Sequence, residues 1–193
     1  EISNALAAKI VLVTGAGGSI GSELCRQIAR LGPNRLIAFE RSEFNLYSIE
    51  LELRRAFPDL VFDAQLGDVT DPVAVEHVRD THRPQVIFHA AAYKHVPLLQ
   101  GQPREAVRNN ILGTRTMVLA ADKIGCETFV MISTDKAVRP TNVMGATKRV
   151  AELLCQALSS RPAMRLITVR FGNVLGSAGS VVPLFQKQIA AGG

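Results

Sequence analysis

The stretch KIVLVTGAGGSIGSELC, residues 9–25, decides the fold of this chain. A short run rich in β-branched residues leads into a turn with glycines at 15, 17, 18 and 21, and a helical pattern follows it. This order suits the pyrophosphate of a dinucleotide, because glycines let the backbone turn sharply and approach the phosphates while the helix N-terminus faces the anion. The stretch therefore predicts a dinucleotide-binding turn. The alternative is a loop that merely contains several glycines.

The composition limits the class of protein. The 193 residues are 47% hydrophobic, enough for one sizeable core, and no apolar run approaches the length that spans a bilayer. The net charge of +5 comes from scattered Lys and Arg, so we expect a phosphate-bearing ligand rather than nucleic acid. The three cysteines are far apart, which predicts buried thiols in a reducing cytosol and no metal site. The chain starts at Glu1 and shows no signal peptide, so we expect a cytoplasmic piece of a longer protein.

Short apolar runs alternate with amphipathic ones along the rest of the chain, which favours a parallel sheet covered by helices. The expected strands cover residues 9–14, 35–39, 61–66, 85–89, 127–132 and 164–170. The expected helices cover residues 19–31, 42–57, 104–124, 144–160 and 181–189. A further helix is expected between the third and fourth strands, ending before Pro84. His89 falls inside a strand and reads as a core residue, whereas His77 and His82 read as surface residues.

Glu40 ends the second expected strand, 19 positions after Gly21. An acidic residue about 20 positions beyond the glycines accepts the hydroxyls of the adenosine ribose and repels a 2′-phosphate, which favours NAD over NADP. Arg41 and Ser42 follow directly and could instead hold that phosphate, so NADP stays possible. Alternatively, Glu40 merely caps the next helix.

The segment from Ser133 to Arg149 reads STDKAVRPTNVMGATKR and follows the fifth strand, where ligands bind in an open α/β sheet. The glycine spacing resembles the short-chain dehydrogenase/reductase superfamily, most of whose members carry Tyr-x-x-x-Lys at this helix start. Here Lys148 is present, but Met144 stands at the Tyr position, and a thioether cannot carry a proton. The usual base for alcohol oxidation is therefore missing.

This departure, together with RFGNVLGS at residues 170–177 and GSVVP at residues 179–183, resembles one family. It is the UDP-N-acetylglucosamine 4,6-dehydratases of polysaccharide and glycan biosynthesis, in particular the long, membrane-anchored members. The resemblance implies a doubly wound parallel sheet of order 3-2-1-4-5-6, one NAD(P)-binding Rossmann domain over residues 1–193, and a further C-terminal substrate region outside this chain. It also implies a homo-oligomer paired through the two long helices, with the full-length protein anchored in the inner membrane and this domain on the cytoplasmic side.

The implied activity is NAD-dependent dehydration of UDP-N-acetylglucosamine to the UDP-4-keto-6-deoxy sugar. Alternatives are a nucleotide-sugar epimerase or reductase of the same superfamily, and a non-catalytic NAD-binding module. The resemblance assigns cofactor contacts to Gly15, Gly18, Ser19, Ile20, Gly21, Glu40, Arg41, Ser42, Asp68, Val69, Ala90, Ala91, Ala92, Lys94 and Lys148. It assigns substrate contacts to Lys94, Asn173 and Val182. It also implies that Asn110 holds a bend and a water in the middle of a long helix. Asp68 could equally be a turn or helix-cap residue, and Lys94 a solvated loop residue.

The resemblance also assigns catalytic roles. Lys136 becomes the base at C5 of the sugar, Asp135 the acid at the C6 hydroxyl, and Thr134 the partner of the C4 oxygen, while Lys148 holds the nicotinamide ribose. We expect burial to raise the pKa of Asp135 and lower that of Lys136, which gives a neutral acid–base pair. The alternative is an exposed structural salt bridge. Because Met144 cannot act, we hypothesise that Asp135, through Thr134 or water, first takes the C4 hydroxyl proton; otherwise Met144 only shapes the pocket.

Overall fold

The chain folds around a six-stranded parallel sheet, as the sequence predicts. The computed structural model describes residues 6–158, 164–172, 174 and 188–190. The strand order is β3-β2-β1-β4-β5-β6, and every adjacent pair runs parallel. The strands are β1 (Ile10–Thr14), β2 (Arg35–Glu40), β3 (Phe62–Leu66), β4 (Val86–His89), β5 (Thr128–Thr134) and β6 (Arg165–Phe171). The order reverses between β1 and β4, which makes the carboxyl ends of these strands the expected place for a ligand.

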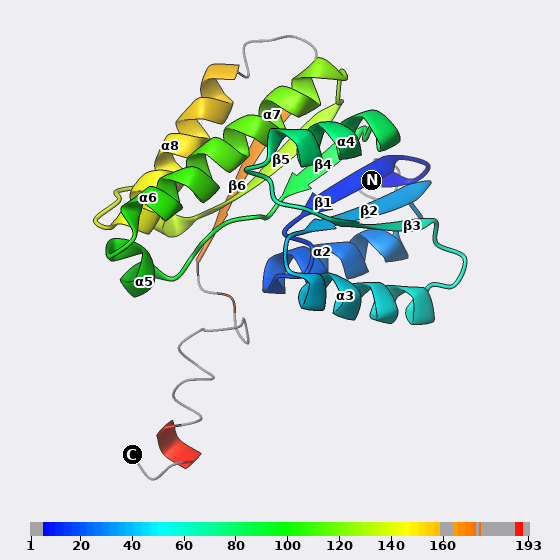
Figure 1. The fold of residues 1–193 in the computed structure, drawn as a ribbon, viewed down its shortest axis with the longest axis horizontal. Coiled ribbons are helices and arrows are strands. Elements are labelled where there is room, and N and C mark those ends of the chain that lie inside the picture. Colours follow the sequence, from blue (N-terminus) through cyan, green and yellow to red (C-terminus); the bar gives the residue numbers. More distant parts are fainter. Residues whose placement is uncertain (1–5, 159–163, 173, 175–187, 191–193) are drawn as a thin grey trace.

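Helices cover both faces of the sheet (Figure 1). On one face lie α2 (Ser19–Arg30) and α3 (Glu43–Ala56), and on the other α4 (Pro72–His82), α7 (Gly113–Lys123) and α8 (Val143–Leu158). Shorter helical pieces are α5 (Val96–Gln100), α6 (Pro103–Ala106), a π-helical turn (Val107–Leu112) and a 3-10 turn (Asp135–Ala137). The expected helix over residues 181–189 falls mostly outside the described residues.

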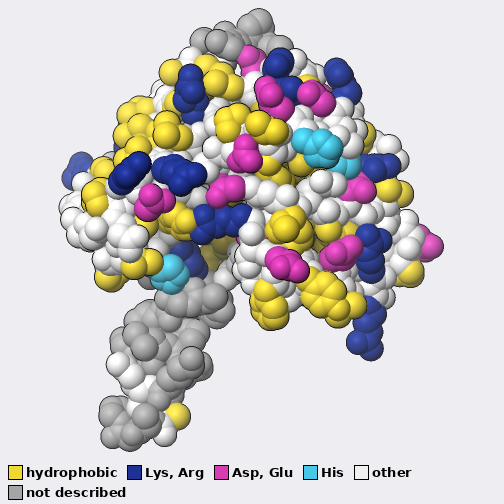
Figure 2. Space-filling model, viewed as in Figure 1, with side chains coloured by type: hydrophobic (Ala, Val, Ile, Leu, Met, Phe, Trp, Pro, Cys, Tyr) yellow, Lys and Arg dark blue, Asp and Glu magenta, His cyan; other side chains and the backbone are white. Residues whose placement is uncertain are grey.

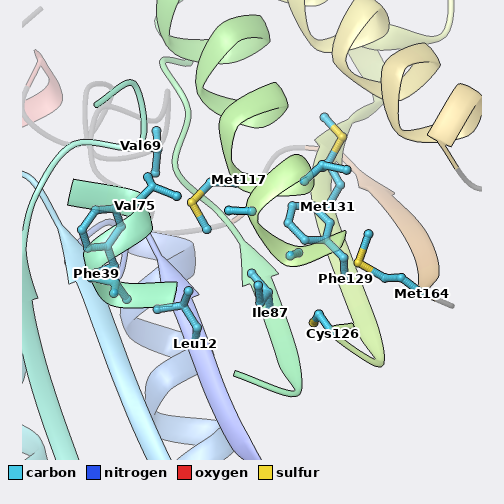
Figure 3. Close-up of a cluster of buried hydrophobic side chains, with 14 of the residues drawn as sticks. Leu12, Phe39, Val69, Val75, Ile87, Met117, Cys126, Phe129, Met131 and Met164 are labelled. Carbon is cyan, nitrogen blue, oxygen red and sulfur yellow. The ribbon is translucent and has the colours of Figure 1, made fainter. Parts of the chain in front are cut away.

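Alternation along the strands gives the sheet two separate apolar faces. In β1, Val11 and Val13 pack toward α2 and α3, whereas Leu12 packs toward α4 and α7. Figure 3 shows the second of these clusters, in which Val75 of α4 and Met117 of α7 point toward the sheet. Burial of β-branched and aliphatic side chains on both faces explains why the strands appear in the sequence as nearly continuous apolar runs.

Capping residues fix where two of the helices begin. The Ser42 hydroxyl accepts a hydrogen bond from the Asn45 amide, and the Asp71 carboxylate accepts one from the Val73 amide. Pro72 occupies the first turn of α4, where its missing N–H costs nothing. Ser42 is thus the N-cap of α3, and the interpretation of Glu40 as that cap is wrong.

The expected helix over residues 104–124 is not regular, because its middle widens into the π-helical turn. Asn110 lies in this turn and is fully buried. Its Nδ2 donates to the Tyr93 carbonyl and to Thr147 Oγ1, both at 3.0 Å, and its Oδ1 accepts from the Tyr93 amide at 2.8 Å. The polar side chain is satisfied by two other segments, so the turn ties the loop after β4 to α8.

Two local predictions are wrong. Strand β5 continues to Thr134, so Ser133 and Thr134 belong to the strand rather than to the loop after it. His82 is buried, with Nδ1 3.8 Å from the Asp63 carboxylate. It shares the buried face of α4 with Val75 and Val78 at helical spacing, and burial, only partly offset by Asp63, lowers its pKa.

Hydrophobic side chains gather over α7 and α8 on the face drawn in Figure 2. The exposed ones on the π-helical turn and α8 are Val107, Leu112, Val150 and Leu153. Pairing of these helices between two copies stays a prediction. In the described part of the chain, no helix combines the length and the apolar character needed to cross a membrane.

Candidate functional site

A cleft of about 260 Å³ opens at the carboxyl ends of β1, β2 and β4. It brings together ten of the predicted cofactor residues: Gly15, Gly18, Glu40, Arg41, Ser42, Asp68, Val69, Ala90, Ala91 and Ala92. Five more residues line it without having been assigned a role from the sequence: Phe39, Asn45, Gly67, Tyr93 and Asn109. The residues converge although the sequence separates them by up to 94 positions, from Gly15 to Asn109.

The glycine turn packs so closely that side chains are excluded from it. Gly15 has φ +65°, and a Cβ added to it would lie 2.7 Å from the backbone of Ala91. A Cβ on Gly21 would overlap the carbonyl oxygen of Gly15, so the start of α2 can pack against the strand end only with glycine there. At Gly18 the nearest atom would be the Gly15 oxygen at 3.3 Å, which leaves the side facing the cleft open.

Glu40 connects the glycine turn to the start of α3. Its Oε2 accepts from the Gly17 amide at 3.1 Å, and its Oε1 accepts from the Ser42 amide at 2.9 Å. The residue is only 9% exposed. A carboxylate can accept about four hydrogen bonds, so Glu40 keeps acceptor capacity for hydroxyl groups in the cleft.

Arg41 reaches across the cleft from β2 toward the loop after β4. Its guanidinium carbon lies 4.5 Å from the centre of the Tyr93 ring, and its Nη1 is 3.7 Å from Asp68 Oδ2. The other oxygen of Asp68 accepts from the Thr70 amide at 2.8 Å. Asp68 therefore forms a turn, which is the alternative left open from the sequence, and also holds Arg41.

His89 lies beneath the cleft in the interior. Its Nδ1 is 2.7 Å from Thr14 Oγ1, and its Nε2 is 3.0 Å from Thr114 Oγ1. Burial lowers its pKa to about 3, so the ring is neutral at pH 7. As expected, this histidine is a hydrogen-bonded core residue, and it links β1, β4 and α7.

The predicted catalytic residues Thr134, Asp135 and Lys136 form one hydrogen-bonded group at the end of β5. Thr134 Oγ1 donates to Asp135 Oδ1 at 2.9 Å, and Lys136 Nζ donates to the same oxygen at 3.1 Å. The expected burial is wrong, since the Asp135 side chain is 57% exposed and that of Lys136 37%. Hydrogen bonds from Lys136 and then Thr134 hold the pKa of Asp135 below its ordinary value. The two residues form an ion pair, with Lys136 Nζ 3.1 Å from Asp135 Oδ1.

Lys148 and Met144 are buried, unlike Asp135 and Lys136. Lys148 Nζ donates to the Ile132 carbonyl at 2.6 Å, and burial lowers its pKa to about 8. Met144 is 4% exposed and packs with Leu99 and Ala106. Its thioether therefore belongs to an apolar cluster, which agrees with a residue that shapes the surroundings rather than moving protons.

Two glycines bring other elements against the Asp135–Lys136 turn. A Cβ on Gly145 would overlap the Lys136 carbonyl oxygen, and one on Gly172 would lie 3.5 Å from Asp135 Oδ2. The sequence contains both glycines within its motifs but does not reveal these contacts, which depend on packing between elements. Of the remaining predicted residues, Lys94 is exposed, Ser19 and Ile20 begin α2, and Asn173 and Val182 lie outside the described residues.

The sequence matches a known family over nearly its whole length. A family model described as "Polysaccharide biosynthesis protein" matches residues 11–193. The chain belongs to this polysaccharide biosynthesis protein family. The recognition made from the motifs of the catalytic segment is thereby confirmed at the level of the family.

Two relatives and one solved structure show how this family member compares. It is 52% identical over 194 residues to the probable polysaccharide biosynthesis protein EpsC of Bacillus subtilis. This alignment covers 100% of the present chain and 32% of EpsC. It is 34% identical over 189 residues to a UDP-N-acetylglucosamine 4,6-dehydratase (inverting) of Campylobacter jejuni, an alignment that covers 95% of this chain and 54% of that protein. The X-ray structure of Pen from Bacillus thuringiensis superposes with a TM-score of 0.87 at 34% sequence identity. The superposition covers 96% of this chain and 57% of the Pen chain. The chain thus spans about a third to just over half of these proteins.

Proposed function

We propose that this chain is the cofactor-binding and catalytic part of an NAD-dependent UDP-N-acetylglucosamine 4,6-dehydratase that serves surface polysaccharide biosynthesis. The observation that carries the proposal is the hydrogen-bonded group Thr134–Asp135–Lys136, one strand away from the glycine cleft, combined with Met144 where a phenol would serve a simple dehydrogenase. The similarity to the dehydratase of Campylobacter jejuni supports the same reaction and substrate class.

The cleft fits NAD by its own chemistry. The open side of Gly18 and the N-terminus of α2 provide a cradle for a diphosphate. Glu40 offers a carboxylate to the adenosine ribose hydroxyls and repels a 2′-phosphate. Arg41 is already engaged by Asp68 and Tyr93, which further favours NAD over NADP. Lys148 would hold the nicotinamide ribose.

The first half of the proposed reaction oxidises C4 of the sugar. When bound, NAD⁺ supplies a reversible hydride acceptor for C4 and later a donor for C6. Thr134 already donates to Asp135, so its hydroxyl can accept from the C4 hydroxyl while passing its own proton to the carboxylate. Hydrogen bonds from Lys136 and then Thr134 lower the pKa of Asp135, so its carboxylate carries no proton before this step.

The second half removes water. Once Asp135 is protonated, Lys136 no longer faces a carboxylate; its ammonium releases one proton to solvent, which leaves the free amine, and takes one back from solvent at the end of the cycle. Lys136 then takes the C5 proton while Asp135 gives its proton to the departing C6 hydroxyl. Lys136 returns its proton to C5 at the end, so the sugar loses one water and nothing else. A bound sugar nucleotide would cover the exposed pair and strengthen this coupling.

The complete protein should be incubated with UDP-N-acetylglucosamine and NAD⁺, and the product identified by NMR. We expect a UDP-4-keto-6-deoxy sugar with deuterium from solvent incorporated at C5. A product inverted only at C4 would favour an epimerase. Cofactor binding without turnover would favour a non-catalytic module.

A further inference from the structure

A buried carboxylate that has no role so far lies where α8, β5 and β6 meet. The side chain of Glu152 is 4% exposed. Its Oε1 accepts from Ser133 Oγ at 2.6 Å and from Arg170 Nε at 2.8 Å. Its Oε2 accepts from Arg170 Nη2 at 2.6 Å and from Arg149 Nη1 at 3.1 Å. Both oxygens are therefore engaged twice, by three side chains.

Each of these contacts leads directly to the catalytic segment. Ser133 is the residue before Thr134 in β5. Arg170 is two positions before Gly172, which lies against the carboxylate of Asp135. Glu152 itself stands four positions after Lys148 on α8, so the two share a face of that helix. One side chain thus joins three elements that carry or adjoin the proposed reacting groups.

Stability alone is a weak reason for such a group. Glu152 is buried, whereas Arg149 and Arg170 stay 39% and 38% exposed. Taking a carboxylate out of water is costly, and apolar replacement of such a group is often as stable. Burial by itself would raise the pKa of Glu152, but the donors Arg170, Ser133 and Arg149 outweigh it and lower the pKa to about 2. The carboxylate is consequently ionised at any working pH, as a fixed anchor for hydrogen-bond donors must be.

We propose that Glu152 is a positioning residue for the dehydration, holding the ends of β5 and β6 in register with Lys148. The inference rests on the proposed function. Rate depends steeply on such positioning, because a misplacement of about 1 Å can slow catalysis about 100-fold. Glu152 is not among the residues that line the cleft, so we expect its effect in the chemical step and not in cofactor binding.

The test uses the complete protein with UDP-N-acetylglucosamine and NAD⁺, comparing Glu152→Gln with the wild type. Gln keeps the size but loses the charge and an acceptor. We expect kcat to fall about 10- to 100-fold with KM for the sugar within about twofold. The alkaline limb of the pH–rate profile should move to lower pH, because the charge of Glu152 helps Lys148 stay protonated. The matched control is Glu127→Gln at the opposite end of β5, which loses an ion pair with Lys9 and should leave kcat unchanged.

Ser133→Ala provides a second variant that removes a single hydrogen bond and leaves the two arginines paired. It should lower kcat by a smaller factor than Glu152→Gln, with a smaller fall in melting temperature. If both variants keep the wild-type kcat and pH profile while only stability falls, Glu152 is structural and the inference is overturned. If the wild-type protein gives no 4-keto product, the proposed function is wrong and so is the inference that rests on it. If the wild type is active but the variants keep its kcat, only the inference is wrong.

Discussion

The glycine turn and the Asp135–Lys136 turn lie at the same edge of the sheet but are built in opposite ways. Around Gly15 and Gly21 the backbone packs so tightly that an added Cβ has no room. At Asp135 and Lys136 the side chains are partly open to solvent, and hydrogen bonds join Asp135 to Lys136 and to Thr134. The glycine turn is therefore preformed, whereas the Asp135–Lys136 turn is open to whatever binds over it.

The two lysines of the site express the same difference. Lys148 is buried with its ammonium on the Ile132 carbonyl, so its charge is costly and its pKa is about 8. Lys136 is 37% exposed and pairs with a carboxylate in water. In the proposed reaction Lys148 only holds a ribose and can be buried in advance, whereas Lys136 must gain and lose a proton and benefits from a partner whose charge changes.

The largest expected effect comes from Asp135→Asn, on the exposed side. Asn cannot take the C4 proton or deliver one to C6, so turnover should fall about 10²- to 10⁴-fold. The melting temperature should stay unchanged, because exposed ion pairs contribute little to stability. Single-turnover absorbance at 340 nm tests the relay, since C4 oxidation at the wild-type rate would contradict a role of Asp135 in that step. Asp80→Asn on α4 removes another exposed carboxylate from an ion pair, here with Arg79, and serves as the control.

Lys148→Met tests the buried side through the pH dependence of stability. The folded-state pKa of about 8 lies below the ordinary 10.5, so the unfolded chain binds the proton more tightly between these values. The wild type bears the full cost of the buried charge below pH 8 and loses that cost as the pH rises to 10.5. The free energy of unfolding of the variant relative to the wild type should therefore drop by about 3 kcal/mol between pH 7 and 10.5.

Urea unfolding of both proteins at several pH values measures this difference. Lys123→Met changes an exposed lysine on α7 and should give a difference that does not vary with pH. A flat curve for Lys148→Met would mean that the folded protein hydrates this ammonium and that the contrast between the two lysines is unfounded.

Gly21→Ala asks whether the tight packing of the turn is needed for cofactor binding. The new Cβ would overlap the Gly15 carbonyl oxygen and push α2 away from the strand end. We expect a loss of about 1–3 kcal/mol in unfolding free energy and at least about tenfold weaker NAD⁺ binding by calorimetry. Gly101→Ala is the control, because its Cβ would have no atom closer than 3.8 Å. Equal binding by the two variants would refute a preformed turn.

Arg41→Ala should give the smallest effect. The stacking of Arg41 on Tyr93 is worth about 0.5–1 kcal/mol at an exposed site, so NAD⁺ affinity should fall by no more than about fivefold. Because Arg41 is engaged by Asp68 and Tyr93, the preference for NAD⁺ over NADP⁺ should not change. Selective loss of NADP⁺ binding would instead show that Arg41 holds a 2′-phosphate.

The sheet and the cofactor side could be predicted because their signals are local. The apolar runs of the strands, the glycine spacing and the acidic residue at position 40 each reflect a requirement of the neighbouring backbone. The strand order agrees with the prediction, and ten of the fifteen predicted cofactor residues converge on one cleft.

Properties that arise between elements could not be predicted. The exposure of Asp135 depends on how β5, α8 and β6 pack, and nothing within STDK reveals it. Glu152 resembles any solvated glutamate of an amphipathic helix until Arg170 and Ser133 are placed beside it. His82 was wrongly predicted for the same reason, since its burial follows from the face that α4 turns toward the sheet.

The π-helical turn at Val107–Leu112 has a geometric consequence for engineering. An extra residue in one turn advances the azimuth of everything after it by about 100°, so α6 and α7 cannot share one continuous helical wheel. Deleting a single residue there would restore ordinary winding and swing Asn110 away from Tyr93 and Thr147. A one-residue deletion in this helix should therefore be more harmful than most single substitutions in it.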